Sequence, residues 1–335
     1  MRHERVGLAR ALIRGALIAL AMTGVASAAD VKHYSFGYDQ PHTTAYGVVA
    51  DTFADKLAAL SNGTMVIDQF PGAQLGQEPQ MLQKIRSGDI DFMISSTANA
   101  ATVSPESGVM SLHFVFRDED HLVKSLADPR IVAAMRQMFE DTVQGGHVLA
   151  LATLGFRDFY SKKEIHSIAD LKGLKVRVQA TATEDAIFPA YGAQTVHMPF
   201  GSVYTSLQTG VMDVAENGVN VYMANKHYEV APIMSLSQHE ANNSVIWVSD
   251  KVWSALTAEQ KGWVQAAADE VSRTEPAKAL ALERDSQTKL EKLGVKFVTV
   301  DKSGFEKIAT PFQDTTAKDL GPHAVKILEL IRSVK

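Results

Sequence analysis

The chain contains the run Val148-Leu149-Ala150-Leu151-Ala152-Thr153-Leu154, which is apolar at every position except Thr153. A strand of this composition is typical of a position buried on both faces, as in a parallel sheet. Segments with apolar residues at helical spacing lie before and after it, and further short strand-like segments alternate with them. This alternation of strands and helices predicts an α/β fold.

The other elements follow from periodicity and from turn residues. We expect strands at residues 33–37, 64–70, 90–95, 175–178, from 211 onward, 245–248 and 296–300. We expect helices at residues 43–60, 79–87, 121–139, 184–191, 203–209, 257–293 and at the C-terminal end. The longest helix begins with a capping box made by Thr257 and Gln260, and Pro276 should kink it or divide it in two.

The N-terminus has the order of segments found in a secretory signal peptide. Four arginines precede an apolar run at residues 15–26, and Ala26-Ser27-Ala28 supplies the small residues of a cleavage site. We therefore predict a signal peptide at residues 1–28, a mature chain that begins near Ala29 or Asp30, and a periplasmic location. The chain has no cysteine, which excludes disulfides, thiolate nucleophiles and cysteine metal sites.

Composition and motifs disfavour several other functions. The formal net charge is −5, which does not suit binding to nucleic acid or to an anionic membrane surface. The chain lacks a G-x-S-x-G elbow, an H-E-x-x-H motif, a P-loop and a G-x-G-x-x-G turn. The eleven histidines are scattered and none falls in a metal-ligand spacing. We therefore predict no catalytic residues, no metal site and no cofactor.

Three polar residues follow or interrupt predicted strands. Arg157 comes just after the apolar strand and Gly155, where α/β sheets bind ligands, and a guanidinium there can hold a carboxylate with two hydrogen bonds. Arg177 alternates with Val176 and Val178, so its local pattern is explained as well by a half-solvated strand. Asn217 precedes Gly218 and could contact a ligand or form a turn; nothing local separates the two.

Several motifs occur in a fixed order along the chain. They are Phe70-Pro71-Gly72-Ala73-Gln74-Leu75-Gly76, Gly88-Asp89-Ile90-Asp91, Leu171-Lys172-Gly173-Leu174-Lys175-Val176-Arg177-Val178, Met198-Pro199-Phe200 and Asp213-Val214-Ala215-Glu216-Asn217. With these motifs, the chain after the leader resembles the solute-binding proteins of TRAP (tripartite ATP-independent periplasmic) transporters, the DctP-type family. Ser202 is a departure, because a glutamate is common there.

The resemblance implies a fold of two α/β lobes that close over a ligand, joined by hinge strands and a long lobe-spanning helix. We expect the first lobe to comprise residues 29–154 and 243–282, and the second lobe residues 155–242 and 283–335. It also implies that Arg177 forms a salt bridge to a ligand carboxylate, that Arg157 assists, that Asn217 contacts the same carboxylate and that Phe200 lines the cavity. Four further residues are candidates for specificity by position only, and a structural role fits each equally well: His42, Glu78, Asn99 and Gln238.

The function that follows is capture of a small organic acid and delivery to the membrane subunits of a TRAP transporter, by a chain expected to be a monomer. The sequence does not identify the part of the ligand beyond its carboxylate; we favour a small polar hydroxy acid. One alternative is a periplasmic enzyme that acts on organic acids through Asp213 or Glu216. Another is the ligand-binding module of a sensory pathway.

Overall fold

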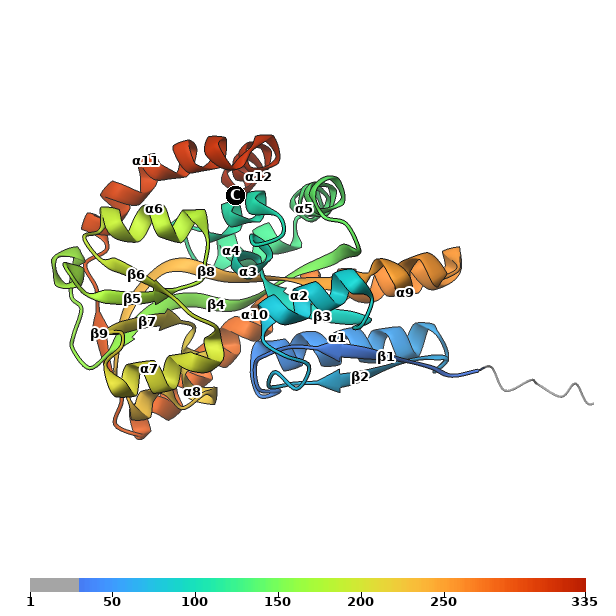
Figure 1. Ribbon diagram of the computed structural model, residues 1–335, viewed down its shortest axis with the longest axis horizontal. Coiled ribbons are helices and arrows are strands. Elements are labelled where there is room, and N and C mark those ends of the chain that lie inside the picture. Colours follow the sequence, from blue (N-terminus) through green and yellow to red (C-terminus); the bar gives the residue numbers. More distant parts are fainter. Residues whose placement is uncertain (1–29) are drawn as a thin grey trace, which may run out of the picture. The chain divides into compact units, whose positions relative to one another are not determined.

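The computed structural model describes residues 30–335, so the predicted signal peptide lies outside the described residues. The strands form one mixed sheet in the order β2-β1-β3-β8-β4-β7-β5-β6, and β9 pairs with β8 outside this order (Figure 1). Their bounds are β1 (Lys32–Gly37), β2 (Met65–Phe70), β3 (Phe92–Ser96), β4 (Gly146–Ser161), β5 (Lys175–Val178), β6 (Gln194–His197), β7 (Val214–Asn217), β8 (Ile233–Ser249) and β9 (Lys296–Thr299).

The α-helices cover both faces of this sheet, which confirms the predicted α/β class. Their bounds are α1 (Ala45–Leu60), α2 (Glu78–Ser87), α3 (Thr97–Ala100), α4 (Glu119–Ala127), α5 (Pro129–Thr142), α6 (Ala182–Ala190), α7 (Val203–Thr209), α8 (Val219–Ala224), α9 (Asp250–Ala255), α10 (Ala258–Lys292), α11 (Ser303–Leu320) and α12 (Pro322–Ser333). No helix among residues 30–335 has both the length and the apolar character needed to cross a membrane.

The strands β4 and β8 form the centre of the sheet and run antiparallel along most of their length. Near one end β8 pairs with β3, and near the other end β4 pairs with β7, so both long strands belong to both halves of the sheet. The run 148–154 lies in β4, and its expected place in a parallel sheet is wrong. Its residues are buried on both faces because apolar side chains pack there from the helices, which antiparallel pairing also permits.

The core is divided among four clusters of buried side chains, two on opposite faces of each half of the sheet. Phe53 of α1 and Val271 of α10 belong to a cluster of the first half, and Phe188 of α6 and Phe305 of α11 to one of the second. Ile327 of α12 packs in the first half together with Trp247, although the predicted boundaries assigned α12 to the second lobe. We therefore propose the expected lobe boundaries with α12 moved to the first lobe.

Two predicted helices differ from the observed ones. The segment 121–139 is not one helix, because Asp128 is extended at the end of α4 and accepts a hydrogen bond from the Arg130 amide at the start of α5. Pro129 lacks an amide hydrogen and disfavours helical geometry in the residue before it, which explains the break. In contrast, α10 continues through Pro276. Of the two predicted effects of this proline, a kink or a division, the division is therefore wrong. Its buried face packs along α1 and β4, which holds the helix together on both sides of the proline.

Candidate functional site

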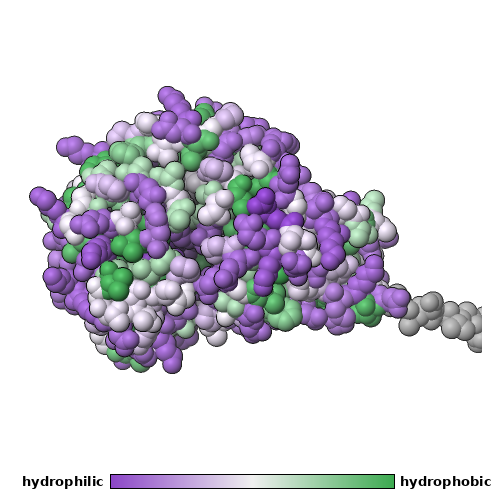
Figure 2. Space-filling view, in the orientation of Figure 1, coloured by the Kyte–Doolittle hydropathy of each residue, from purple (hydrophilic) through white to green (hydrophobic). Residues whose placement is uncertain are grey.

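Two adjoining cavities lie between the two halves of the molecule. They share five lining residues: Asp39, Asn99, Arg177, Gln179 and Phe200. The larger cavity has a volume of about 280 Å³ and is bounded by the start of α2 and by the segment before α7. Figure 2 shows a hollow on this face of the molecule, between these two regions. The smaller cavity extends to the central strands and reaches Arg157, Asn217 and Asn242.

Arg177 is a buried cation with no acidic partner. It lies on β5 with 3% of its surface exposed. Its Nε and Nη2 donate hydrogen bonds to the carbonyl oxygen of Met198, at 3.2 and 2.9 Å, and its guanidinium carbon lies 5.8 Å from the centre of the Phe200 ring. No carboxylate of residues 30–335 forms a salt bridge with it. Burial lowers the pKa of its guanidinium overall, although the more distant Glu216 and Asp39 act to raise it. An anion that enters the cavity would therefore meet a buried guanidinium that has no direct ion pair within residues 30–335.

Arg157 differs because its charge is already balanced. It lies on β4, where Nε and Nη2 donate to the carboxylate of Glu216 on β7, and Glu240 of β8 lies 3.4 Å from Nε. Burial alone would lower the pKa of Arg157, but the two carboxylates raise it overall. Within the described chain its Nη1 makes no hydrogen bond, so this nitrogen can still donate to a ligand.

Asn217 is the last residue of β7, and its side-chain carbonyl oxygen already accepts hydrogen bonds. Its Oδ1 accepts hydrogen bonds from the Gly218 amide and from Asn242 Nδ2, both at 2.9 Å. The side-chain nitrogen of Asn217, Nδ2, makes no hydrogen bond to residues 30–335, and the residue lines the smaller cavity. Asn217 can therefore act as a donor to a carboxylate beside the two arginines.

Glu78 lines the smaller cavity, but both of its carboxylate oxygens already accept hydrogen bonds from the protein. They accept hydrogen bonds from the Tyr46 hydroxyl at 3.0 Å, the Ser96 amide at 2.9 Å, the Ser96 hydroxyl at 2.8 Å and Asn99 Nδ2 at 2.7 Å. This network holds α2, α3 and the end of β3 together and orients Asn99, which lines both cavities. Glu78 therefore organises the wall of the cavity.

Two of the candidates lie outside both cavities. His42 is half exposed, with Nδ1 2.8 Å from the Tyr38 hydroxyl and Nε2 3.4 Å from Asp51. Gln238 is exposed in an irregular part of β8, where its Oε1 accepts from Lys302 Nζ at 2.7 Å. The structure thus brings Arg157, Asn217 and the residues described above together, but not these two.

Asp39 and Gln179 line both cavities and were not among the predicted residues. Burial, and then the nearby Glu78, raise the pKa of the Asp39 carboxyl well above its usual range, so it can donate a hydrogen bond to a ligand hydroxyl. Both residues follow the carboxyl end of a strand, β1 for Asp39 and β5 for Gln179. The rule that singled out Arg157 would have found them.

A cavity between two halves of one sheet, with a buried arginine in its wall that forms no salt bridge within residues 30–335, is the arrangement of a two-lobed protein that binds a small anionic solute. The comparison with family models agrees: residues 36–319 match the DctP model, described as bacterial extracellular solute-binding protein, family 7. The chain belongs to this family. The resemblance found in the sequence is thereby confirmed, and the protein is a solute-binding protein of the TRAP type.

Three similar proteins illustrate the family. The 2,3-diketo-L-gulonate-binding periplasmic protein YiaO of Escherichia coli (strain K12) is 28% identical over 96% of this chain and 99% of its own length. A TRAP periplasmic solute-binding protein of Xanthobacter autotrophicus Py2, solved with bound β-D-galacturonate, is 31% identical with a TM-score of 0.83, covering 90% of this chain and all of that one. A TRAP periplasmic solute-binding protein of Pseudomonas putida F1, solved with bound D-glucuronate, is 29% identical with a TM-score of 0.83. The match covers 91% of this chain and 98% of that one.

Proposed function

We propose that this chain captures a sugar acid in the periplasm and delivers it to the membrane subunits of a TRAP transporter. The observation that carries the proposal is the buried Arg177, which has no acidic partner among residues 30–335 and lines both cavities. A carboxylate would bind its guanidinium in the fork geometry that arginine offers, with Arg157 Nη1 and the Asn217 amide as further donors.

The rest of the ligand is proposed from the other polar groups of the cavities. Asp39, Asn99, Thr102, Gln77 and Gln179 offer both donors and acceptors, which suits a molecule with several hydroxyl groups. Phe200 provides an apolar face beside them. The uronates bound by the two structural relatives have this combination of one carboxylate and several hydroxyls. We therefore prefer a sugar acid to a simple dicarboxylate or an aromatic acid.

We further propose that the ligand leaves the protein chemically unchanged. Glu216, one carboxylate considered for catalysis, is held by Arg157. Asp213, the other, accepts a hydrogen bond from the Lys175 amide at 2.9 Å and lines a separate cavity. The test is to incubate the purified protein with the sugar acid and to recover the ligand for mass spectrometry; any conversion above the rate without protein would favour an enzyme.

The ligand class is tested by thermal shift. The purified mature protein is screened against D-galacturonate, D-glucuronate, galactonate and 2,3-diketo-L-gulonate, with the matching amides and neutral sugars as controls. A ligand that binds only the folded protein raises its melting temperature with ligand concentration. We expect acids to stabilise the protein and their amides to have no effect. Equal shifts with acids and amides would contradict the carboxylate site.

A further inference from the structure

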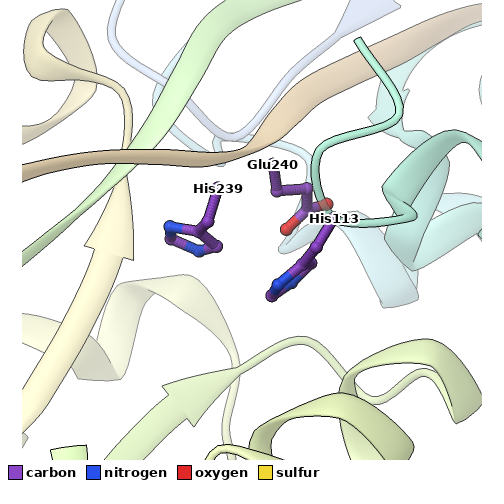
Figure 3. A group of neighbouring side chains, drawn as sticks. All are labelled: His113, His239 and Glu240. Atoms are coloured by element: carbon purple, nitrogen blue, oxygen red, sulfur yellow. The ribbon is translucent and has the colours of Figure 1, made fainter. Parts of the chain in front are cut away.

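Three side chains that are distant in sequence meet in the interior beside Arg157. His113 lies in the loop before α4, and His239 and Glu240 are neighbours on β8. One nitrogen or oxygen atom from each lies within 4.8 Å of the others, and all three residues are buried. Figure 3 shows the Glu240 carboxylate pointing into the space between the two imidazole rings. The spacing of histidines along the sequence gave no sign of this cluster.

Both imidazole rings are oriented by a hydrogen bond on their outer nitrogen. His113 Nδ1 lies 2.9 Å from the Tyr191 hydroxyl, and His239 Nδ1 lies 2.7 Å from the Ser237 hydroxyl. The Nε2 atoms of both rings are buried and make no hydrogen bond with residues 30–335. This is the arrangement of histidines that bind a metal, where a hydrogen bond on one nitrogen fixes the ring and leaves the other nitrogen for the ion.

A fourth side chain, Glu184 of α6, lies at the edge of this cluster. It is 1% exposed, and neither of its oxygens has a hydrogen-bond partner within the described chain. Its Oε2 lies 3.6 Å from His113 Nε2. Glu240 Oε2 also makes no hydrogen bond with residues 30–335, although it lies 3.4 Å from Arg157 Nε. Because buried polar atoms are rarely left unpaired, four unpaired groups in one place require an explanation.

Acidic side chains outnumber basic ones around the cluster. Glu184, Glu216 and Glu240 are three buried carboxylates, and Arg157 is the positive side chain paired with them among residues 30–335. Burial raises the pKa of the Glu240 carboxyl well above its usual range and that of Glu184 to about 8, so in the absence of a cation these two groups hold protons. One divalent cation would replace those protons and would also bind the nitrogen and oxygen atoms that make no hydrogen bond.

We propose that His113, His239 and Glu240, joined by Glu184 once its side chain turns toward them, form a binding site for one divalent transition-metal ion of the zinc class. Two imidazoles and two carboxylates are ligands that zinc accepts, usually in tetrahedral geometry. With bonds of about 2.1 Å, ligand atoms in such a site lie roughly 3.4 Å apart, close to the 3.6 Å between Glu184 and His113. An ion there would tie β8 and α6 to the loop before α4. The site is distinct from the solute cavities, and the proposal does not depend on which solute is bound.

The test uses the full chain, expressed with its leader and purified without a histidine tag. The protein is treated with a chelator, desalted and titrated with Co²⁺, whose visible spectrum distinguishes tetrahedral from octahedral coordination. A parallel sample is incubated with Zn²⁺, passed through a desalting column and assayed for metal. We expect one equivalent of zinc to be retained and the cobalt form to show a tetrahedral spectrum.

Variants locate the ion. His113→Gln and the double change Glu184→Gln with Glu240→Gln should each weaken zinc binding at least tenfold. The matched controls are His33→Gln and His166→Gln. His33 lies 3.1 Å from Asp68 and His166 lies 2.9 Å from Glu164, so each exposed pair could bind a metal ion adventitiously. Unchanged binding in the cluster variants, or loss in the controls, would overturn the proposal. If a cluster variant does not fold, the measurements on the wild-type protein test the proposal alone. Absence of retained zinc and of a tetrahedral cobalt spectrum would overturn it and would indicate that the buried carboxyl groups are protonated instead.

Discussion

Arg157 and Arg177 show how far two buried arginines can differ at the level of the residue. Both are at most 3% exposed and both line the smaller cavity. Glu216 and Glu240 compensate the charge of Arg157. Within residues 30–335 Arg177 donates only to the Met198 carbonyl, and it lies near the Phe200 ring. The larger part of the binding energy for an acid should therefore come from Arg177.

Replacement of Arg177 should weaken binding of the acid strongly. Arg177→Ala would leave a buried carboxylate without its partner, which costs about 2–5 kcal/mol of binding free energy, or from about 30-fold to a few thousand-fold in the dissociation constant. Arg177→Lys should also bind more weakly than wild type, because an ammonium group cannot form the planar fork. Titration calorimetry measures both. Arg284→Ala is the control, since Arg284 pairs with Glu119 on the surface. Wild-type affinity in Arg177→Ala would exclude the proposed role.

Glu283 of α10 should make stability depend on pH. Burial raises the pKa of its carboxyl to about 8 from a usual value of 4.5. Between these values the folded chain holds more protons than the unfolded chain, so the contribution of Glu283 to the free energy of unfolding falls as pH rises. The melting temperature of Glu283→Gln should therefore change less steeply than that of wild type over this pH interval. Glu291→Gln, an exposed change on the same helix, is the control. Parallel curves for wild type and Glu283→Gln would contradict the assignment.

The site residues were predictable where strand ends or family motifs indicated them. Arg157, Asn217 and Phe200 all line the smaller cavity. His42 could not be assigned from sequence because its position near the end of β1 does not reveal that Tyr38 and Asp51 engage its ring. Contacts between distant segments, such as the one between Arg157 and Glu216, depend on the register of β4 and β7, which no local pattern specifies.

At the level of the element, local signals placed most helices and short strands but not the two longest strands. The run 148–154 covers only part of β4, because its second half carries polar residues such as Arg157 and Asp158 that are buried by pairing with other segments. The same applies to β8, of which only 245–248 is strongly apolar. Periodicity detects the burial of apolar side chains, and it cannot detect the burial of polar ones by ion pairs and hydrogen bonds.

The irregular point of β4 at Gly155 supports a contact between three elements. Gly155 has a φ of 87°, and a Cβ atom there would lie 2.7 Å from Cγ of Glu283. Glu283 in turn accepts hydrogen bonds from the amides of Val219 and Asn220 at the start of α8, at 2.6 and 2.8 Å. The missing side chain therefore allows a carboxylate of α10 to reach past β4 and hold α8, next to Asn217.

Gly155→Ala should destabilise the protein. The left-handed backbone alone costs about 1–3 kcal/mol of the free energy of unfolding for a residue with a side chain, and the close contact with Glu283 adds to this. Denaturant titration measures the change. Gly262→Ala is the control, because Gly262 lies in α10 with no heavy atom near its added Cβ, and alanine there should stabilise by about 0.5–1 kcal/mol. An unchanged stability in Gly155→Ala would show that β4 can adjust at this point.

At the level of the whole molecule, both halves contribute to the walls of the cavities. Asn99 follows β3 in the first half, and Arg177 and Gln179 come from the second; Gln179 Nε2 also donates to the Ser96 hydroxyl at 3.1 Å, which joins the two halves directly. A solute that touches both walls stabilises the arrangement in which the walls are close, by the difference between its affinities for the closed and open forms.

Solution scattering should detect this closure. Addition of the acid that gives the largest thermal shift should reduce the radius of gyration of the wild-type protein, whereas the same concentration should leave Arg177→Ala unchanged. The matching amide serves as the ligand control for the wild-type protein. A radius of gyration that does not change in wild type, at a concentration shown to saturate the site, would argue against closure on binding.

The buried charge of Arg177 also bears on what happens when no solute is present. A guanidinium withdrawn from water without a counter-ion is energetically unfavourable, and the cost grows as the surroundings become drier. An empty protein with its walls together carries this cost, and a loaded one does not. If the proposed function holds, the membrane subunits of the transporter would therefore meet closed proteins that carry a solute far more often than closed proteins that are empty.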